Sequence, residues 1–164
     1  MRDDYESGVG GKDGLELRVW LRLITCFNLM DGAVRQKLHQ EYATTLPRFD
    51  VLAQLHREDG PLTMGELSRR LMVTNGNVTG LIDRLAREGL VERKPAADDR
   101  RRQLVAMTDR GQAFFETMAS DHQDWIADMT GDLNAAEKRE LFRLLGRLKQ
   151  SILTPQSDTT EAAE

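Results

Sequence analysis

Cysteine, signal-like segments and long apolar runs are all scarce or missing in this sequence. A single cysteine, Cys26, stands among the 164 residues, so an internal disulfide is excluded and nothing indicates an oxidising compartment. No segment approaches the roughly 20 apolar residues that span a bilayer. The N-terminal residues mix acidic side chains with glycine and lack the basic-then-apolar order of a signal peptide. We therefore expect a cytoplasmic protein that does not enter a membrane.

Motifs for catalysis and metal binding are also missing from the sequence. His39, His56 and His122 are far apart, and none has a His or Cys three or four residues away, as ligand pairs on helices commonly do. The sequence has no phosphate-cradling glycine loop, no nucleophile elbow and no paired inward carboxylates. We therefore expect no enzymatic activity, no cofactor and no bound metal.

Aromatic residues and net positive charge are in short supply as well. Five Phe, two Trp and two Tyr are few for a surface that stacks RNA bases, and the net charge of −4 argues against nucleic acid. The charge is unevenly distributed, however. Residues 66–110 carry 10 basic and 7 acidic groups, a net charge of +3, whereas residues 1–65 carry −2 and residues 111–164 carry −5. Because counterion release depends on the charge that faces the phosphates, the central segment is a candidate DNA-binding surface.

Helical periodicity covers most of the chain outside this segment. A long helix with a wide apolar stripe is expected from residue 15, and a shorter one from Leu46 with Pro47 in its first turn. Thr108 and Asn134 start two further helices. The stripe of the long helix consists of Leu15, Val19, Leu23, Phe27, Met30, Val34 and Leu38. The predicted inward positions of the last two helices are Phe115, Met118, His122, Trp125, Ile126 and Met129, then Leu141, Leu144, Leu145, Leu148 and Ile152.

The central segment has the pattern of a helix-turn-helix followed by a β-hairpin. Thr63 and Glu66 fit a capping box that starts a short helix, and Thr74 can cap a second one that Gly89 ends at about residue 88. Two short helices joined by a tight turn form a helix-turn-helix. Strand-like segments 90–94 and 103–107 then flank a polar loop with three successive arginines, Arg100, Arg101 and Arg102. The expected fold is mainly α with a small β-hairpin wing.

The second helix of this motif carries candidate base-reading residues. Asn can bond an adenine edge with two hydrogen bonds, and a Thr methyl can contact a thymine methyl. The candidates for DNA contact on this helix are Thr74, Asn75, Asn77, Thr79 and Arg84. The alternative is that Asn and Thr only cap the helix start.

Two glycines lie four residues apart in the same helix. Gly76 and Gly80 together destabilise a free helix by about 2 kcal/mol relative to alanine. This loss suggests that another group approaches the helix closely, either the preceding helix or DNA.

These segments resemble the MarR family of winged helix-turn-helix transcription regulators. The resemblance lies in LTMGELSRRLMVTNGNVTGLIDRLAREGLVERK and DDRRRQLVAMTDRG, with TLPRFDVLAQL before them, and extends from about residue 15 to 152. The wing signature of the family falls on Asp99, Arg101, Thr108 and Gly111, with Met107 in place of the usual Leu. By this resemblance Arg101, held by Asp99, enters the minor groove, where a narrow A·T tract attracts arginine.

The resemblance also implies a domain organisation and an obligate homodimer. The expected domains are a dimerisation helix at 13–44, a winged helix-turn-helix at 45–110 and dimerisation helices at 108–153, between flexible tails at 1–12 and 154–164. Within the middle domain the recognition helix covers about 74–88 and the wing about 90–107. Two recognition helices would then read a pseudo-palindromic double-stranded DNA operator with half-sites about one helical turn apart. The expected function is that of a ligand-responsive repressor.

A small-molecule effector that binds between the two regions is implied as well. The opening LELRVWLRLITC, together with TLPRFDVLAQL, resembles regulators of aromatic-acid catabolism, which implies an aromatic acid or an aromatic acyl-CoA thioester. The candidates for an apolar pocket with polar handles are Trp20, Ile24, Phe27, His39 and Arg48. The alternative is that Trp20 and Phe27 belong to the dimer core.

Two other functions were weighed against the repressor. Cys26 could act as a redox switch, although a lone Cys on an apolar helix is usually a small buried hydrophobe, and only Arg22 lies near it as a basic neighbour. The winged helix could also be a protein-interaction module whose wing arginines bind an acidic partner.

Overall fold

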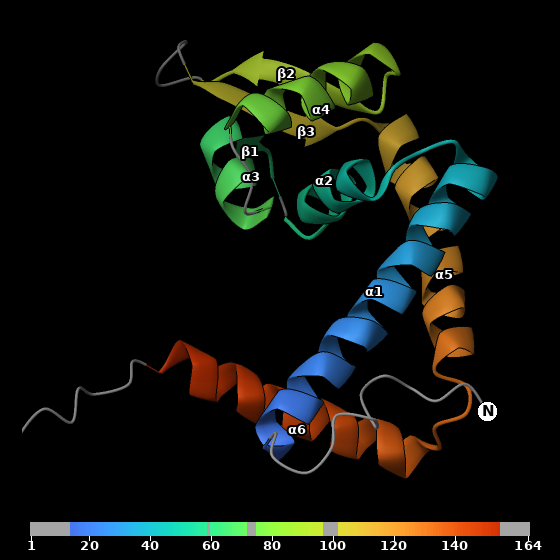
Figure 1. Ribbon diagram of the computed structural model, residues 1–164. Coiled ribbons are helices and arrows are strands. Elements are labelled where there is room, and N and C mark those ends of the chain that lie inside the picture. Colours follow the sequence, from blue (N-terminus) through green and yellow to red (C-terminus); the bar gives the residue numbers. More distant parts are fainter. Residues whose placement is uncertain (1–13, 59, 72–74, 97–101, 155–164) are drawn as a thin grey trace, which may run out of the picture. The chain divides into compact units, whose positions relative to one another are not determined.

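The computed structural model describes residues 14–58, 60–71, 75–96 and 102–154 (Figure 1). Asp99, Arg100, Arg101 and Thr74 lie outside the described residues, as do residues 1–12 and 155–164 of the two expected tails. The chain divides into two compact units, Met1–Ile126 and Ala127–Glu164. No helix in the described ranges has an apolar stretch long enough to cross a membrane.

The described residues of the first unit form four complete helices, most of a fifth helix and one small sheet. In chain order its elements are α1 (Leu15–Tyr42), α2 (Leu46–His56), β1 (Leu62–Thr63), α3 (Met64–Leu71), α4 (Asn75–Arg87), β2 (Val91–Pro95), β3 (Gln103–Met107) and α5 (Asp109–Met129). The second unit contains α6 (Ala135–Leu153). The mainly α fold with a β-hairpin is confirmed.

The sheet has one strand more than the sequence predicted. β2 and β3 form the expected antiparallel hairpin, in which Val91 lies opposite Met107. β1 adds to the other side of β3, where Leu62 pairs with Val105, so the strand order is β1-β3-β2. A strand of two residues is too short to show alternation in a sequence, so no pattern predicted β1.

The core of the first unit lies between α2, α3, α4 and the sheet. Side chains from each of these elements are at most 1% exposed: Leu52, Leu67, Val78, Ile82, Leu85 and Val105. α4 contributes three of them at the i, i+4 and i+7 positions of one helix face. Because that face is fixed by packing, the opposite face of α4 is presented to solvent.

A close contact joins the end of α4 to the start of α5. Gly89 has a φ of 70°, and the Leu90 N–H donates to the Leu85 carbonyl at 2.9 Å, which is the expected left-handed helix stop. The Thr108 hydroxyl donates to the Gly89 carbonyl at 2.7 Å and accepts from the Gly111 N–H at 3.0 Å. A Cβ at Gly111 would lie 1.9 Å from the Leu90 carbonyl oxygen, so only glycine fits there. This contact gives a physical reason for the Thr and Gly of the wing signature.

The C-terminal end of α1 packs against α5. The Tyr42 hydroxyl donates to the Asp121 carboxylate, and its ring meets Phe114 edge-on at 5.8 Å. Burial, assisted by this hydrogen bond, raises the pKa of Tyr42 to about 12. The His122 ring lies 4.9 Å from that of Phe49, and burial lowers the pKa of His122. Phe115, Met118 and Trp125 are buried as predicted, whereas His122, Ile126 and Met129 are only partly covered.

Two predicted apolar stripes are largely uncovered within the single chain. The prediction that the α6 leucines and Ile152 are buried is wrong here, since no residue of α6 is buried and these five are 39–73% exposed. Of the α1 stripe only Val34 and Leu38 are buried, whereas Leu15, Val19 and Phe27 are 69%, 46% and 66% exposed. Amphipathic patterning shows that a face is apolar, but it does not show what covers that face.

Candidate nucleic-acid interface

The exposed face of α4 carries the predicted base-reading residues that the structure describes. Asn77, Thr79 and Arg84 are exposed, on parts of the helix surface away from the buried stripe. Asn75 is the first residue of α4. The sequence prediction of which α4 residues face outward is therefore confirmed for these three.

The glycines of α4 are not needed for packing inside the chain. A Cβ added at Gly76 or at Gly80 would meet nothing within 4 Å. The described part of the preceding helix, α3, therefore does not approach α4 closely at either glycine.

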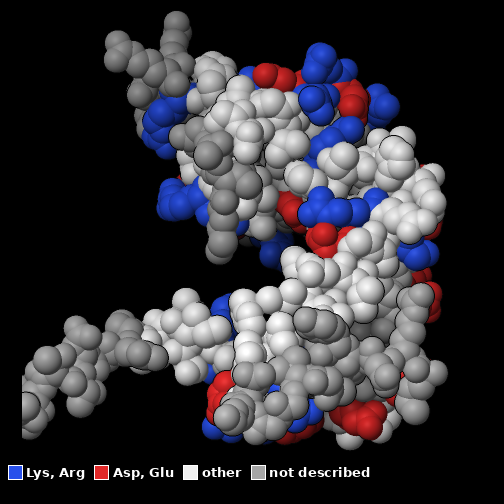
Figure 2. Space-filling view, in the orientation of Figure 1, with Lys and Arg blue, Asp and Glu red and all other residues white. Residues whose placement is uncertain are grey.

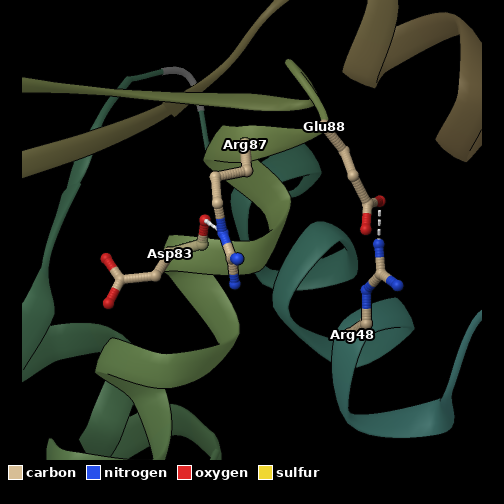
Figure 3. Close-up of polar contacts among 4 residues, drawn as sticks. All are labelled: Arg48, Asp83, Arg87 and Glu88. Atoms are coloured by element: carbon tan, nitrogen blue, oxygen red, sulfur yellow. Dashed lines mark hydrogen bonds and ion pairs between the residues drawn. The ribbon is translucent and has the colours of Figure 1, made fainter.

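Polar contacts hold the C-terminal half of α4 and the residue after it (Figure 3). Arg48 reaches across from α2 and donates through Nη2 to the carboxylate of Glu88. The Arg48 side chain is 12% exposed and Glu88 46%, so this pair is half-buried. Within α4, the Nε of Arg87 donates to the backbone carbonyl of Asp83 at 3.3 Å.

The start of α3 is fixed by the predicted capping box. The Thr63 N–H donates to Glu66 Oε2 at 2.8 Å, and the Glu66 N–H donates to Thr63 Oγ1 at 3.2 Å. The Thr63 hydroxyl also donates to Glu66 Oε2, at 2.7 Å, and this bond together with the one from the Thr63 N–H holds the pKa of Glu66 below its usual value. Next to this cap lies an open hollow lined by Arg69 and Arg102. Arg102 is thus the one wing arginine that the structure places, exposed and directly before β3.

Basic side chains gather over the part of the first unit built from α3, α4 and the hairpin, with acidic ones among them (Figure 2). Several of these bases lie in ion pairs, including Arg70 with Glu58 at 2.5 Å and Lys94 with Glu92 at 2.5 Å. The local excess of positive charge predicted for residues 66–110 therefore lies on a surface that includes the exposed face of α4.

Comparison with known proteins agrees with this geometry. A family model described as the MarR family matches residues 44–102. The transcriptional activatory protein BadR of Rhodopseudomonas palustris is 32% identical over 152 residues, which cover 88% of this chain and 86% of BadR. The chain belongs to the MarR family. This membership confirms the resemblance seen in the sequence and makes the chain a DNA-binding transcriptional regulator, in a family of regulators and not of enzymes.

Two further MarR-family relatives extend the comparison. The HTH-type transcriptional regulator PecS of Dickeya dadantii is 30% identical over 127 residues, which cover 76% of each chain. A mutant of MarR from E. coli, solved in complex with operator DNA, is 31% identical with a TM-score of 0.69, covering 83% of this chain and 99% of that one.

In this MarR-family chain, the five predicted effector residues do not come together around one hollow. Arg48 lines an open hollow of about 450 Å³ between the end of α1, α2, the end of α4 and α5. Trp20, Ile24 and Phe27 lie further along α1, at 58%, 37% and 66% exposure, and His39 is exposed near its end. The residues that line the hollow are Tyr42, Ala43, Thr44, Arg48, Arg87, Glu88, Leu90, Arg110 and Phe114.

The structure also bears on the two remaining sequence hypotheses about chemistry. Cys26 is exposed on α1 of the single chain, so it is not the buried hydrophobe that its helix suggested. Among the described residues, no group of three His, Cys, Asp or Glu side chains could hold a metal ion.

Sequence reasoning missed one contact at this interface. Arg93, on β2, reaches the exposed side of α4, where its Nη2 lies 2.7 Å from Asp83 Oδ1 and donates to the Thr79 carbonyl at 3.3 Å. Strand and helix residues ten or more positions apart show no shared periodicity, so no signal in the sequence could pair them.

Proposed function

We propose that this MarR-family protein binds a pseudo-palindromic operator as a homodimer, with α4 in the major groove. The observation that carries the proposal is the outer face of α4, where exposed Asn77 and Thr79 alternate with glycines that meet nothing in the chain. Major-groove reading uses polar side chains on a helix that can approach base edges closely. Thr74, Asn75 and Arg84 complete the proposed contact set on this helix.

The wing is proposed to contact the adjacent minor groove. Arg100, Arg101 and Arg102 supply the positive charge, and Asp99 orients Arg101, as the family signature implies. The exposure of Arg102, directly before β3, supports this arrangement, because an arginine on the surface can reach a groove.

Dimerisation is proposed to use α1 and the C-terminal helices. Each presents large apolar side chains to solvent in the single chain, among them Phe27 at 66%, Phe142 at 81% and Ile152 at 73% exposure. Monomeric soluble proteins rarely expose contiguous apolar stripes of this kind. The domain boundaries given for the sequence, with 45–110 as the DNA-binding part, follow from this proposal.

An acidic effector is proposed for the hollow beside Arg48. The Nε–H of Arg48 is buried and has no hydrogen-bond partner among the described residues, although Nη2 is paired with Glu88. A buried unpaired donor is unfavourable unless another group satisfies it, and a carboxylate is the natural partner of a guanidinium. The carboxylate of an aromatic acid fits this chemistry, as does a phosphate of its CoA thioester, with Phe114 and Tyr42 as apolar walls. Trp20, Ile24, Phe27 and His39 remain predicted contributors.

The operator proposal is tested by DNA-binding titrations with selected palindromic and scrambled duplexes at several salt concentrations. We expect a preference of at least about 10³-fold for the operator. Equal affinity for both duplexes would favour the protein-interaction module instead. Because BadR is named an activatory protein, in vitro transcription with and without the protein tests the proposed repression.

The effector proposal is tested by thermal unfolding with benzoate and with its CoA thioester. A ligand at one hundred times its Kd stabilises the folded protein by about 2.7 kcal/mol. We expect Arg48→Gln to lose this stabilisation, whereas Arg57→Gln, which removes an exposed charge just after α2, keeps it. Equal stabilisation of both variants would place the ligand elsewhere.

A further inference from the structure

Arg93 connects the first strand of the wing to the recognition helix. Its guanidinium meets two groups of α4 at once, the carboxylate of Asp83 at 2.7 Å and the backbone carbonyl of Thr79 at 3.3 Å. The Arg93 side chain is 30% exposed and that of Asp83 51%. The contact therefore lies at the surface, on the exposed side of the helix, and not in the core.

The two groups that Arg93 holds are one helical turn apart, and one of them belongs to a proposed base-reading residue. A guanidinium with several fixed N–H donors can bond a carboxylate and a carbonyl in a defined relative orientation, which a lysine ammonium does not impose. The bond to Thr79 fixes backbone, so it fixes where the first turns of α4 lie relative to β2.

The relative placement of helix and wing matters for binding DNA. If α4 enters the major groove while the wing enters the adjacent minor groove, both must be in position at the same moment. A helix and a hairpin that move independently would have to be ordered on binding, and that ordering weakens affinity.

We propose that Arg93 is a positioning residue for DNA recognition, which acts by locking β2 to α4 through Asp83 and the Thr79 carbonyl. The inference rests on the proposed roles of α4 and the wing. The rival role for an arginine at this surface is a direct bond to a DNA phosphate.

The substitution Asp83→Asn distinguishes the two roles, because they predict opposite changes in DNA affinity. If Arg93 bonds a phosphate, Asp83 competes for it, and Asp83→Asn removes a negative charge near DNA and strengthens binding. If Arg93 locks the strand to the helix, Asp83→Asn weakens the lock and weakens operator binding, although it makes the protein more positive.

The experiment measures operator binding by fluorescence anisotropy across a salt series for four variants of the full chain. These are Arg93→Ala, Asp83→Asn, the double variant, and Lys94→Ala as a matched control. Lys94 is the next residue on β2, is 68% exposed and pairs with Glu92 of the same strand, so its removal costs the same charge without touching α4. Thermal unfolding of each variant accompanies the titrations.

We expect Arg93→Ala to weaken operator binding about tenfold, since a dimer contains the contact twice. Asp83→Asn should weaken it in the same direction, and the double variant should bind no worse than Arg93→Ala alone because both changes break one contact. The salt slope of Arg93→Ala should stay as in the parent protein. Lys94→Ala should weaken operator binding less than Arg93→Ala does. The unfolding midpoints should move by less than about 3 °C because the pair is half-exposed.

Three results would overturn the inference: tighter binding by Asp83→Asn, additive losses in the double variant, or a salt slope that falls by about one unit per half-site in Arg93→Ala. Equal losses in Arg93→Ala and Lys94→Ala would do the same. A parent protein without operator preference would instead count against the proposed function itself.

Discussion

Asn77 and Thr79 are set apart from the polar residues of other helices by what surrounds them. Both are exposed on α4, between two glycines at which an added Cβ would meet nothing within 4 Å. The side chains of Thr108 and Asn134, by comparison, accept hydrogen bonds from backbone N–H groups at the starts of α5 and α6. Asn77 is the third residue of the helix, so the alternative raised for the asparagines, that they only cap the helix start, predicts a role for it at the N-terminal turn alone. The amide of Asn77 is exposed in the free protein and can therefore reach a partner.

Asn77→Ala tests this role at the scale of one residue. We expect a loss of about 1–3 kcal/mol in binding to the preferred operator and little loss on random DNA. The reason is that the Asn77 amide forms its hydrogen bonds only with a matching base edge. Gln123→Ala, an exposed amide on α5, serves as the control and should bind like the parent. Equal losses on both duplexes for Asn77→Ala would reduce Asn77 to a structural role.

At the scale of the element, α4 combines a rigid inner face with an outer face of low helix propensity. Val78, Ile82 and Leu85 are fully buried, so packing maintains a helix whose glycines would destabilise it in isolation. Its C-terminal end is further fixed by the left-handed Gly89 and by the Arg48–Glu88 pair. The helix therefore depends on the core for its stability and leaves its outer face open.

Gly80→Ala is expected to affect stability and DNA binding in opposite directions. Because the added methyl meets no atom within 4 Å, the helix should gain about 1 kcal/mol and the unfolding midpoint should rise by about 3 °C. Operator binding should weaken, since the methyl occupies the space of close approach. Gly32→Ala, at an equally open glycine of α1, should raise stability without weakening binding. Unchanged operator affinity in Gly80→Ala would mean that DNA does not approach there.

At the scale of the whole molecule, the single chain leaves large apolar side chains of α1 and α6 exposed to solvent. The side chains between α2, α3, α4 and the sheet form a buried core. In contrast, α6 has no buried residue, and the apolar side chains of Leu15, Trp20 and Phe27 on α1 are exposed. Burying one such side chain fully is worth about 1.5–3 kcal/mol. Association of two copies would cover these stripes, and it would explain the breadth of the stripe on α1.

Leu148→Glu tests that association. Because a symmetric dimer contains the position twice, we expect the dimer Kd to rise at least about a hundredfold in analytical ultracentrifugation. Gln150→Glu adds the same charge two residues away on the polar part of α6 and should leave the dimer intact. If Leu148→Glu dimerises like the parent, the leucine face of α6 is not the interface.

The sequence by itself determined the local features of this protein. Periodicity gave the helices, and short-range chemistry gave their ends at Thr63, Gly89 and Asn134, because caps and stops involve residues only a few positions apart. The outward face of α4 followed from the same periodicity. Only the tertiary structure decided which elements meet: the third strand, the reach of Arg48 to Glu88, and the bond of Arg93 to α4. Those contacts join residues ten or more positions apart, and their distances depend on how the chain folds back on itself, which no local pattern encodes.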